Sequence, residues 1–201
     1  MSDTPPMSTN IADEELKPQE SYLKHLDTLR DMIANDHFGG EMPTQIVDQW
    51  VKVLEPGGEI EVPAGVKGFY GGSLRSSIPI EVARGSYKFI THETVEKGKI
   101  DKYARRMLIA LSLLDIDTLV NQDPNLGALA LWHIALAQVR LPDRAEMLGK
   151  TLIQYQDVRP KSKLSDSKLP QPDRLKTRLT AMAKDIDNEP ALNLLINWHP
   201  F

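Results

Sequence analysis

Apolar residues follow helical spacing through much of the chain, and the longest such stretch covers residues 99–139. From Ile100 onward, apolar positions recur at the i+3 and i+4 intervals that line one face of an α-helix. The sixteen positions from Pro124 to Val139 then carry no formal charge, and Asp123 before Pro124 is typical of a helix start. We therefore expect a buried helical hairpin over residues 99–139, around which the other elements pack.

Shorter segments on both sides of this hairpin also place their apolar residues on one helix face. They lie at residues 21–38, 43–54, 145–155 and 175–186. Asp143 and Glu146 have the spacing of a capping box at the start of the third segment. The sequence thus predicts a mainly α-helical fold, with a single domain of about six helices.

Residues 56–90 have a different composition, with six glycines between positions 57 and 72. The segments 59–62 and 86–90 contain the alternating or β-prone residues that are typical of short strands. We expect a small β-hairpin or a glycine-rich insertion at about residues 56–90.

Two other segments are predicted to lack regular structure. Residues 1–17 are acidic and contain Pro5 and Pro6, so they bury too little apolar surface to offset the entropy lost on ordering. Residues 159–173 hold three prolines and three serines without apolar periodicity. We expect a disordered tail at 1–17, followed by one domain over residues 18–201 with a flexible linker at about 159–173.

The amino-acid composition limits the possible functions mainly because it excludes several classes of site. Cysteine is absent from the 201 residues, which excludes disulfides, thiolate nucleophiles and cysteine-based metal sites. The first residues lack the basic and apolar regions of a signal peptide, and no apolar run is long enough to cross a bilayer. We expect a cytoplasmic protein with no membrane partner. A formal net charge of -4 gives no general attraction to nucleic acid.

Charge is nevertheless distributed unevenly along the chain. Residues 1–42 carry nine acids and three bases, whereas residues 159–178 carry seven bases and two acids, and a second basic run covers residues 97–106. If these basic segments bind nucleic acid, the phosphate contacts come from Lys99, Lys102, Arg105, Arg106, Arg174, Lys176 and Arg178. A solvated surface, or pairing with the acidic N-terminal region, also explains these residues. We favour this simpler interpretation because dedicated binders are usually basic overall.

The glycine-rich loop is a second candidate for contact with phosphate or single-stranded nucleic acid. Its side chains for such contacts are Lys67, Phe69, Tyr70 and Arg75. The glycine spacing matches neither the GxxxxGK[ST] motif nor the GxGxxG motif. We favour an ordinary turn, since glycine supplies positive φ angles there without any ligand.

No constellation of residues indicates catalysis or metal binding. No two of the five histidines are four residues apart, and the sequence has no GxSxG motif. His133 follows Trp132 in the uncharged stretch, where a buried imidazole finds a hydrogen-bond partner or stays neutral. We interpret His133 as a core histidine. We expect no metal, no cofactor and no catalytic residue, and therefore no enzyme.

The chain ends in an apolar segment that includes Leu195, Trp198 and Phe201. This patch is too apolar to remain in water, so it packs on its own domain or docks on a partner. We favour packing within the domain, because C-terminal helices commonly dock there.

These observations favour a non-catalytic interaction protein, an accessory subunit or regulator within a larger bacterial assembly. Its expected partner is another protein. The alternative is a nucleic-acid-binding subunit or regulator that uses the basic residues at 97–106 and 159–178. Nothing in the sequence specifies the oligomeric state.

Overall fold

The computed structural model describes residues 74–91 and 97–200 of the chain. These residues form seven α-helices and two short 3-10 helices, with no β-strand among them. The α-helices are α3 (Leu74–Thr91), α4 (Lys97–Leu111), α5 (Ile116–Gln122), α6 (Pro124–Gln138), α7 (Ala145–Val158), α8 (Pro172–Asp185) and α9 (Glu189–Asn197). The 3-10 helices are η2 (Pro142–Arg144) and η3 (Arg159–Lys161). The expected mainly α-helical fold is therefore confirmed for the described part of the chain.

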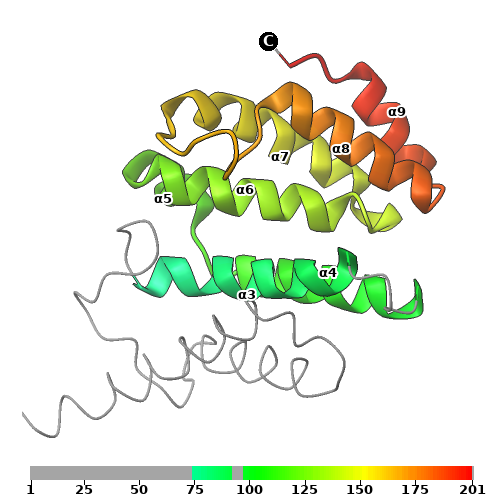
Figure 1. Cartoon of the computed structure of the whole chain (residues 1–201), viewed down its shortest axis with the longest axis horizontal. Helices are drawn as coiled ribbons and strands as arrows, with labels where there is room; N and C mark the ends of the chain where they lie inside the picture. Colours follow the sequence, from blue (N-terminus) through cyan, green and yellow to red (C-terminus); the bar gives the residue numbers. More distant parts are fainter. Residues whose placement is uncertain (1–73, 92–96, 201) are drawn as a thin grey trace, which may run out of the picture.

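Helix α6 is the centre of this part of the molecule. In Figure 1 it crosses the middle, with α3 and α4 on one side and α7, α8 and α9 on the other. Eleven of its fifteen residues are buried, in agreement with its lack of charged side chains. Because a buried leucine contributes roughly 1.5 to 3 kcal/mol, α6 is a principal source of stability.

The predicted helical hairpin over residues 99–139 is present, although its connection contains an additional helix. α4 and α6 pack on each other, and α6 begins at the expected cap. The Asp123 carboxylate accepts hydrogen bonds from the backbone N–H groups of Asn125 and Leu126, at 3.1 Å each. The sequence did not reveal α5, because its seven residues are too few to show helical periodicity.

The expected β-hairpin is wrong for the part of residues 56–90 that the structure describes. The segment 86–90, predicted as a strand, is the C-terminal part of α3. α3 packs on α4 and α6 and buries Ile80 and Val82. This burial outweighs β preferences that differ by only about 1 kcal/mol between residues. The predicted strand 59–62 lies outside the described residues.

The segment expected to be a flexible linker, residues 159–173, is anchored to the domain at several points. Arg159 is only 4% exposed, and its guanidinium binds the Asp166 carboxylate at 2.7 Å. It also donates to the backbone carbonyls of Leu169 and Pro170, at 3.1 and 3.2 Å. Between η3 at its start and α8 at its end the segment has no helix, and the buried Arg159 holds it against the domain.

Helices α7 and α8 lie where the apolar spacing predicted them. The predicted apolar positions Leu148, Leu152, Leu175 and Leu179 are fully buried. The predicted capping box is wrong, because α7 begins at Ala145 after η2 and has no side-chain cap. The Asp143 carboxylate binds Arg105 instead.

The apolar C-terminal segment packs on its own domain. Leu195 is fully buried, and Trp198 is 9% exposed. The Trp198 indole N–H donates to Oε1 of Gln156 in α7 at 3.1 Å. Phe201 lies outside the described residues. So do three other predicted segments, the tail at 1–17 and the helices at 21–38 and 43–54.

Candidate binding sites

An apolar groove of about 490 Å³ opens between the C-terminal half of α4, the start of α5, α6 and the start of α7. We call it the α4–α6 groove. Its apolar walls include Leu108, Ile109, Leu111, Leu114, Ile134 and Met147. Ile109 and Met147 are each 49% exposed. Large side chains that gather at a concave surface while exposed are typical of a binding surface rather than of scattered surface residues.

Two arginines and one carboxylate lie at this groove. Arg105 donates to both oxygens of Asp143, at 3.2 and 3.3 Å. Arg144 Nε lies 3.5 Å from Asp143 Oδ2. The hydrogen bonds from Arg105 lower the pKa of the Asp143 carboxyl. All three groups are about half exposed, so these ion pairs add little stability. The groove keeps a net positive charge, because two cations share one anion.

Gln138 adds a polar group to the same groove. The residue lines the groove and is 3% exposed. Its Oε1 atom is buried and accepts no hydrogen bond from the part of the chain that the structure describes. Buried polar atoms usually have a partner, so this oxygen is an unsatisfied acceptor in a residue that lines the groove.

A second cluster joins α3, α6 and α8. The Arg178 guanidinium of α8 lies 5.3 Å from the centre of the Tyr87 ring and 6.0 Å from that of Trp132. Arg178 Nη2 also donates to the Tyr87 hydroxyl at 2.5 Å. In residues 74–91 and 97–200 no carboxylate forms an ion pair with Arg178, so the aromatic faces hold an arginine that keeps its positive charge.

His133 lies in this cluster and is a core histidine, as the sequence predicted. It is 2% exposed, and its Nδ1 lies 2.8 Å from the Leu129 carbonyl. Since a carbonyl only accepts, Nδ1 carries the proton. Burial lowers the pKa of His133 to about 4, and the charges of Arg84 and Arg178 act in the same direction. The imidazole is therefore neutral near pH 7.

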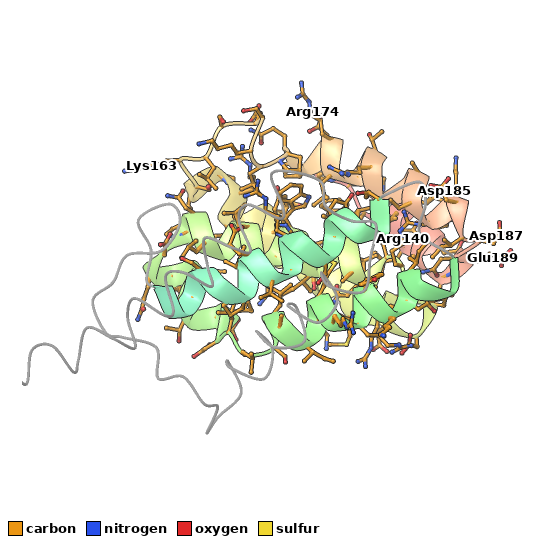
Figure 2. All side chains as sticks on the ribbon, turned by 60° about the horizontal axis from the view of Figure 1, so that its bottom comes forward. Arg140, Lys163, Arg174, Asp185, Asp187 and Glu189 are labelled. Atoms are coloured by element: carbon orange, nitrogen blue, oxygen red, sulfur yellow. The ribbon has the colours of Figure 1, made fainter. Side chains whose placement is uncertain are left out.

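Arg140 follows Val139, the residue that ends α6. It is 9% exposed, and its Nε atom is buried without an acceptor among the described residues. Burial lowers the pKa of Arg140, while Tyr87 and Asp185 act in the opposite direction. Figure 2 shows Arg140 at the same end of the molecule as Asp185, Asp187 and Glu189.

The basic residues proposed to bind nucleic acid have different environments. On α4, Lys102 is exposed, whereas Arg105 binds Asp143. Arg106 is 8% exposed and lies 5.5 Å from the centre of the Tyr103 ring. The side chain of Lys99 is outside the described part.

The three predicted basic residues of α8 have different surroundings. Arg174 is exposed and, with Lys163, points outward in Figure 2. Lys176 Nζ donates to the backbone carbonyls of Ile196 and Trp198 and so holds the C-terminal end of α9. Arg178 turns toward Tyr87. Lys176 and Arg178 thus both make contacts within the domain, so the side chains of the three residues do not all point outward.

The predicted loop contacts cannot be placed at a site, because Lys67, Phe69 and Tyr70 lie outside the described residues, as does the side chain of Arg75. Sequence reasoning missed Gln138 and Arg140. Arg140 had one signal: it carries the only formal charge in residues 124–142.

Neither metal ligands nor a membrane span is found in residues 74–91 and 97–200. No three histidine or acidic side chains there gather to hold a metal ion. None of the helices in those ranges is long and apolar enough to cross a bilayer. No protein-family model, curated protein or solved structure matches this chain.

Proposed function

We propose that this protein is a non-catalytic interaction protein, an accessory subunit or regulator of a larger bacterial assembly. In this proposal the α4–α6 groove holds an amphipathic helix of a protein partner. The observation that carries the proposal is the groove itself, a concave apolar surface of about 490 Å³ with Ile109 and Met147 exposed on it. Grooves between helices commonly receive the apolar face of another helix.

The charges at the groove indicate the chemistry of that partner. Among the described residues Arg105 and Arg144 share one carboxylate, that of Asp143, so an acidic residue beside the apolar face of the partner helix gains a favourable contact. The expected ligand is thus an amphipathic helix with apolar anchors at i, i+3 or i+4 and i+7, flanked by at least one carboxylate.

Site-directed photocrosslinking in the native host tests this proposal. A photoreactive amino acid replaces Met147 in the full chain, and the matched control carries it at Ile153, which is 60% exposed but does not line the groove. We expect a crosslinked protein from position 147 and not from position 153. A synthetic peptide with the sequence of the crosslinked segment should then bind the purified chain and become helical.

The variant Ile109→Asp should abolish that peptide binding. Its effect on stability should remain within about 0.5 kcal/mol, because the side chain is about half exposed. Two results contradict the proposal. One is the same crosslinked species from positions 147 and 153. The other is crosslinking only to residues 21–54 of the same chain, whose apolar spacing also predicts helices.

A further inference from the structure

The chain itself contains a segment with the features that the α4–α6 groove requires of a ligand. Residues 43–55 have apolar side chains at helical spacing, with Val47, Val51 and Leu54 at positions i, i+4 and i+7. Trp50 extends the same face of the predicted helix. This is the spacing of the anchors by which an amphipathic helix binds in an apolar groove. The segment lies outside the residues that the structure describes, so the groove and this sequence pattern carry the inference together.

The charges of the segment are complementary to those of the groove. Asp48 and Glu55 lie three residues before and four residues after Val51, so in a helix both carboxylates border the apolar face. At the groove, Arg105 and Arg144 share one carboxylate among the described residues. Docking of the segment therefore brings negative charge to a surface that has an excess of positive charge.

The connection to α3 is long enough to bring the segment to the groove. Residues 55–73 join it to Leu74, the first residue of α3. An extended chain of this length spans about 60 Å, whereas the 18 residues of α3 form a helix about 27 Å long. The connection is thus about twice as long as this helix and does not prevent the segment from reaching the groove.

Both the segment and the groove have apolar surface that docking would cover. Isolated helices shorter than about 12 to 15 residues are marginal in water, so a helix in residues 43–55 needs another surface to cover its apolar face. The groove presents such a surface, because Ile109 and Met147 are each 49% exposed. A segment on the same chain has an effective concentration of about 1 mM. Even weak docking within the chain therefore competes with a scarce partner.

We propose that residues 43–55 dock as a helix in the α4–α6 groove of their own chain and compete there with the partner helix. The apolar face of the segment covers Ile109 and Met147, and its carboxylates lie on the side of the two arginines. The competition rests on the proposed function, whereas the docking does not. A partner then binds only when it displaces the segment, so the protein inhibits its own binding site.

Crosslinking within the purified full chain tests the docking. A photoreactive amino acid replaces Met147, and the matched control carries it at Ile153, which is exposed but does not line the groove. Equal amounts of isotope-labelled and unlabelled copies are mixed, without any other protein. We expect crosslinks from position 147 to residues 43–55 of the same copy, and none from position 153.

Two outcomes of this crosslinking experiment overturn the proposal. The first is the absence of crosslinks between position 147 and residues 43–55. The second is a set of crosslinks that join labelled to unlabelled copies as often as random pairing predicts, because the segment then docks on a second copy of the chain.

A fluorescent peptide with the sequence of residues 43–55 measures whether the groove is occupied. The variant Val51→Asp places a charge on the apolar face and should release the segment. Fluorescence anisotropy should then show peptide binding about ten times tighter than in wild type, if the tethered segment at about 1 mM competes with a dissociation constant of about 0.1 mM. The matched control Gln45→Asp adds the same charge on the opposite face and should bind like wild type.

The groove is identified as the binding site of this peptide by a second substitution. Adding Ile109→Asp to Val51→Asp should abolish the binding, because Ile109 lines the groove. Equal peptide affinities of wild type and Val51→Asp overturn the proposal, as does tight binding that Ile109→Asp does not weaken.

The crosslinking experiment in the native host separates this inference from the proposed function. A crosslink within the chain, without any partner, supports the docking and contradicts the proposed function. A partner crosslink without a crosslink to residues 43–55 has the opposite meaning. When both crosslinks form, the partner peptide should bind Val51→Asp about ten times more tightly than wild type. An unchanged partner affinity overturns the proposed competition.

Discussion

Asn188 and Val139 are joined by a buried hydrogen bond, in which Nδ2 of Asn188 donates to the Val139 carbonyl at 2.9 Å. The Oδ1 atom of the same side chain caps α9 by accepting from the Ala191 backbone N–H at 3.2 Å. Asn188 is 1% exposed, and Val139 directly precedes Arg140. One side-chain amide thus holds the end of α6 against the start of α9.

Replacing Asn188 by alanine should therefore destabilise the protein strongly. The variant loses a helix cap, worth typically about 1 kcal/mol, and leaves a buried carbonyl unpaired, at about 1 to 3 kcal/mol. We expect the free energy of unfolding, measured by urea denaturation, to fall by about 2 to 4 kcal/mol. Asn188→Ser keeps a capping oxygen and should lose less. A change below about 0.5 kcal/mol for Asn188→Ala is a surface-like effect and contradicts this account.

Replacing Gly127 by alanine and replacing Gly149 by alanine should change the stability of the protein in opposite directions. A Cβ atom at Gly127 would lie 2.7 Å from Cα of Val120, so α5 and α6 must separate, at a cost of about 1 to 3 kcal/mol. At Gly149 a Cβ would meet only the flexible end of Leu194, at 3.1 Å. Alanine there should be neutral or stabilising by up to about 1 kcal/mol, because glycine is the poorer helix former. Thermal melts of both variants check the difference, and equal effects would show that the α5–α6 contact is not tight.

His133 should make the protein less stable in acid. The unfolded histidine binds a proton below its usual pKa of about 6.5, whereas the folded one resists protonation down to about 4. Its contribution to stability is therefore complete above pH 6.5 and falls as the pH decreases toward 4, by roughly 3 kcal/mol in all. Urea denaturation at several pH values measures this slope.

The matched variants are His133→Gln, which removes the titrating group, and His199→Gln, which changes an exposed histidine. Only His133→Gln should reduce the pH dependence of the free energy of unfolding between pH 6.5 and 4. If both variants keep the slope of wild type, other groups cause the acid sensitivity.

Nucleic acid should bind weakly at physiological salt. The basic residues that suggested a phosphate stripe point to Asp143, Tyr103, Tyr87 and the end of α9, while Lys102 and Arg174 are exposed. We expect dissociation constants no tighter than about 10⁻⁶ M at 0.15 M salt, the range of non-specific contacts. Fluorescence anisotropy with labelled DNA and RNA measures this. Binding near 10⁻⁸ M that is lost in the double variant Lys102→Glu and Arg174→Glu would favour the nucleic-acid alternative, since affinities of this order require specific recognition.

The core of the fold was predictable because the features that produce it, apolar spacing and helix caps, involve residues close together in the sequence. The uncharged stretch in residues 124–139 has no stable place in water, so it predicted the buried α6. The Asp123-Pro124 start needs only the side chain and the backbone next to it. The apolar stripes of α7 and α8 likewise follow from spacing alone.

The candidate sites were not predictable in the same way, because they depend on which helices meet. Nothing near Arg178 in the sequence shows that the rings of Tyr87 and Trp132, 91 and 46 positions earlier, lie beside its guanidinium. The α4–α6 groove exists only because α4, α6 and α7 leave their apolar side chains incompletely covered at one place.

The sequence by itself determined a helical protein with a buried centre, since apolar periodicity and helix caps act over a few residues. Only the tertiary structure decided that the β-prone residues 86–90 are helical, because the packing of α3 on α4 and α6 outweighs a small local preference. The tertiary structure also decided which basic side chains make contacts within the domain. The sequence shows how many basic residues a segment carries. Whether Arg178 or Lys176 can contact a ligand depends on the neighbours that folding brings within hydrogen-bond distance.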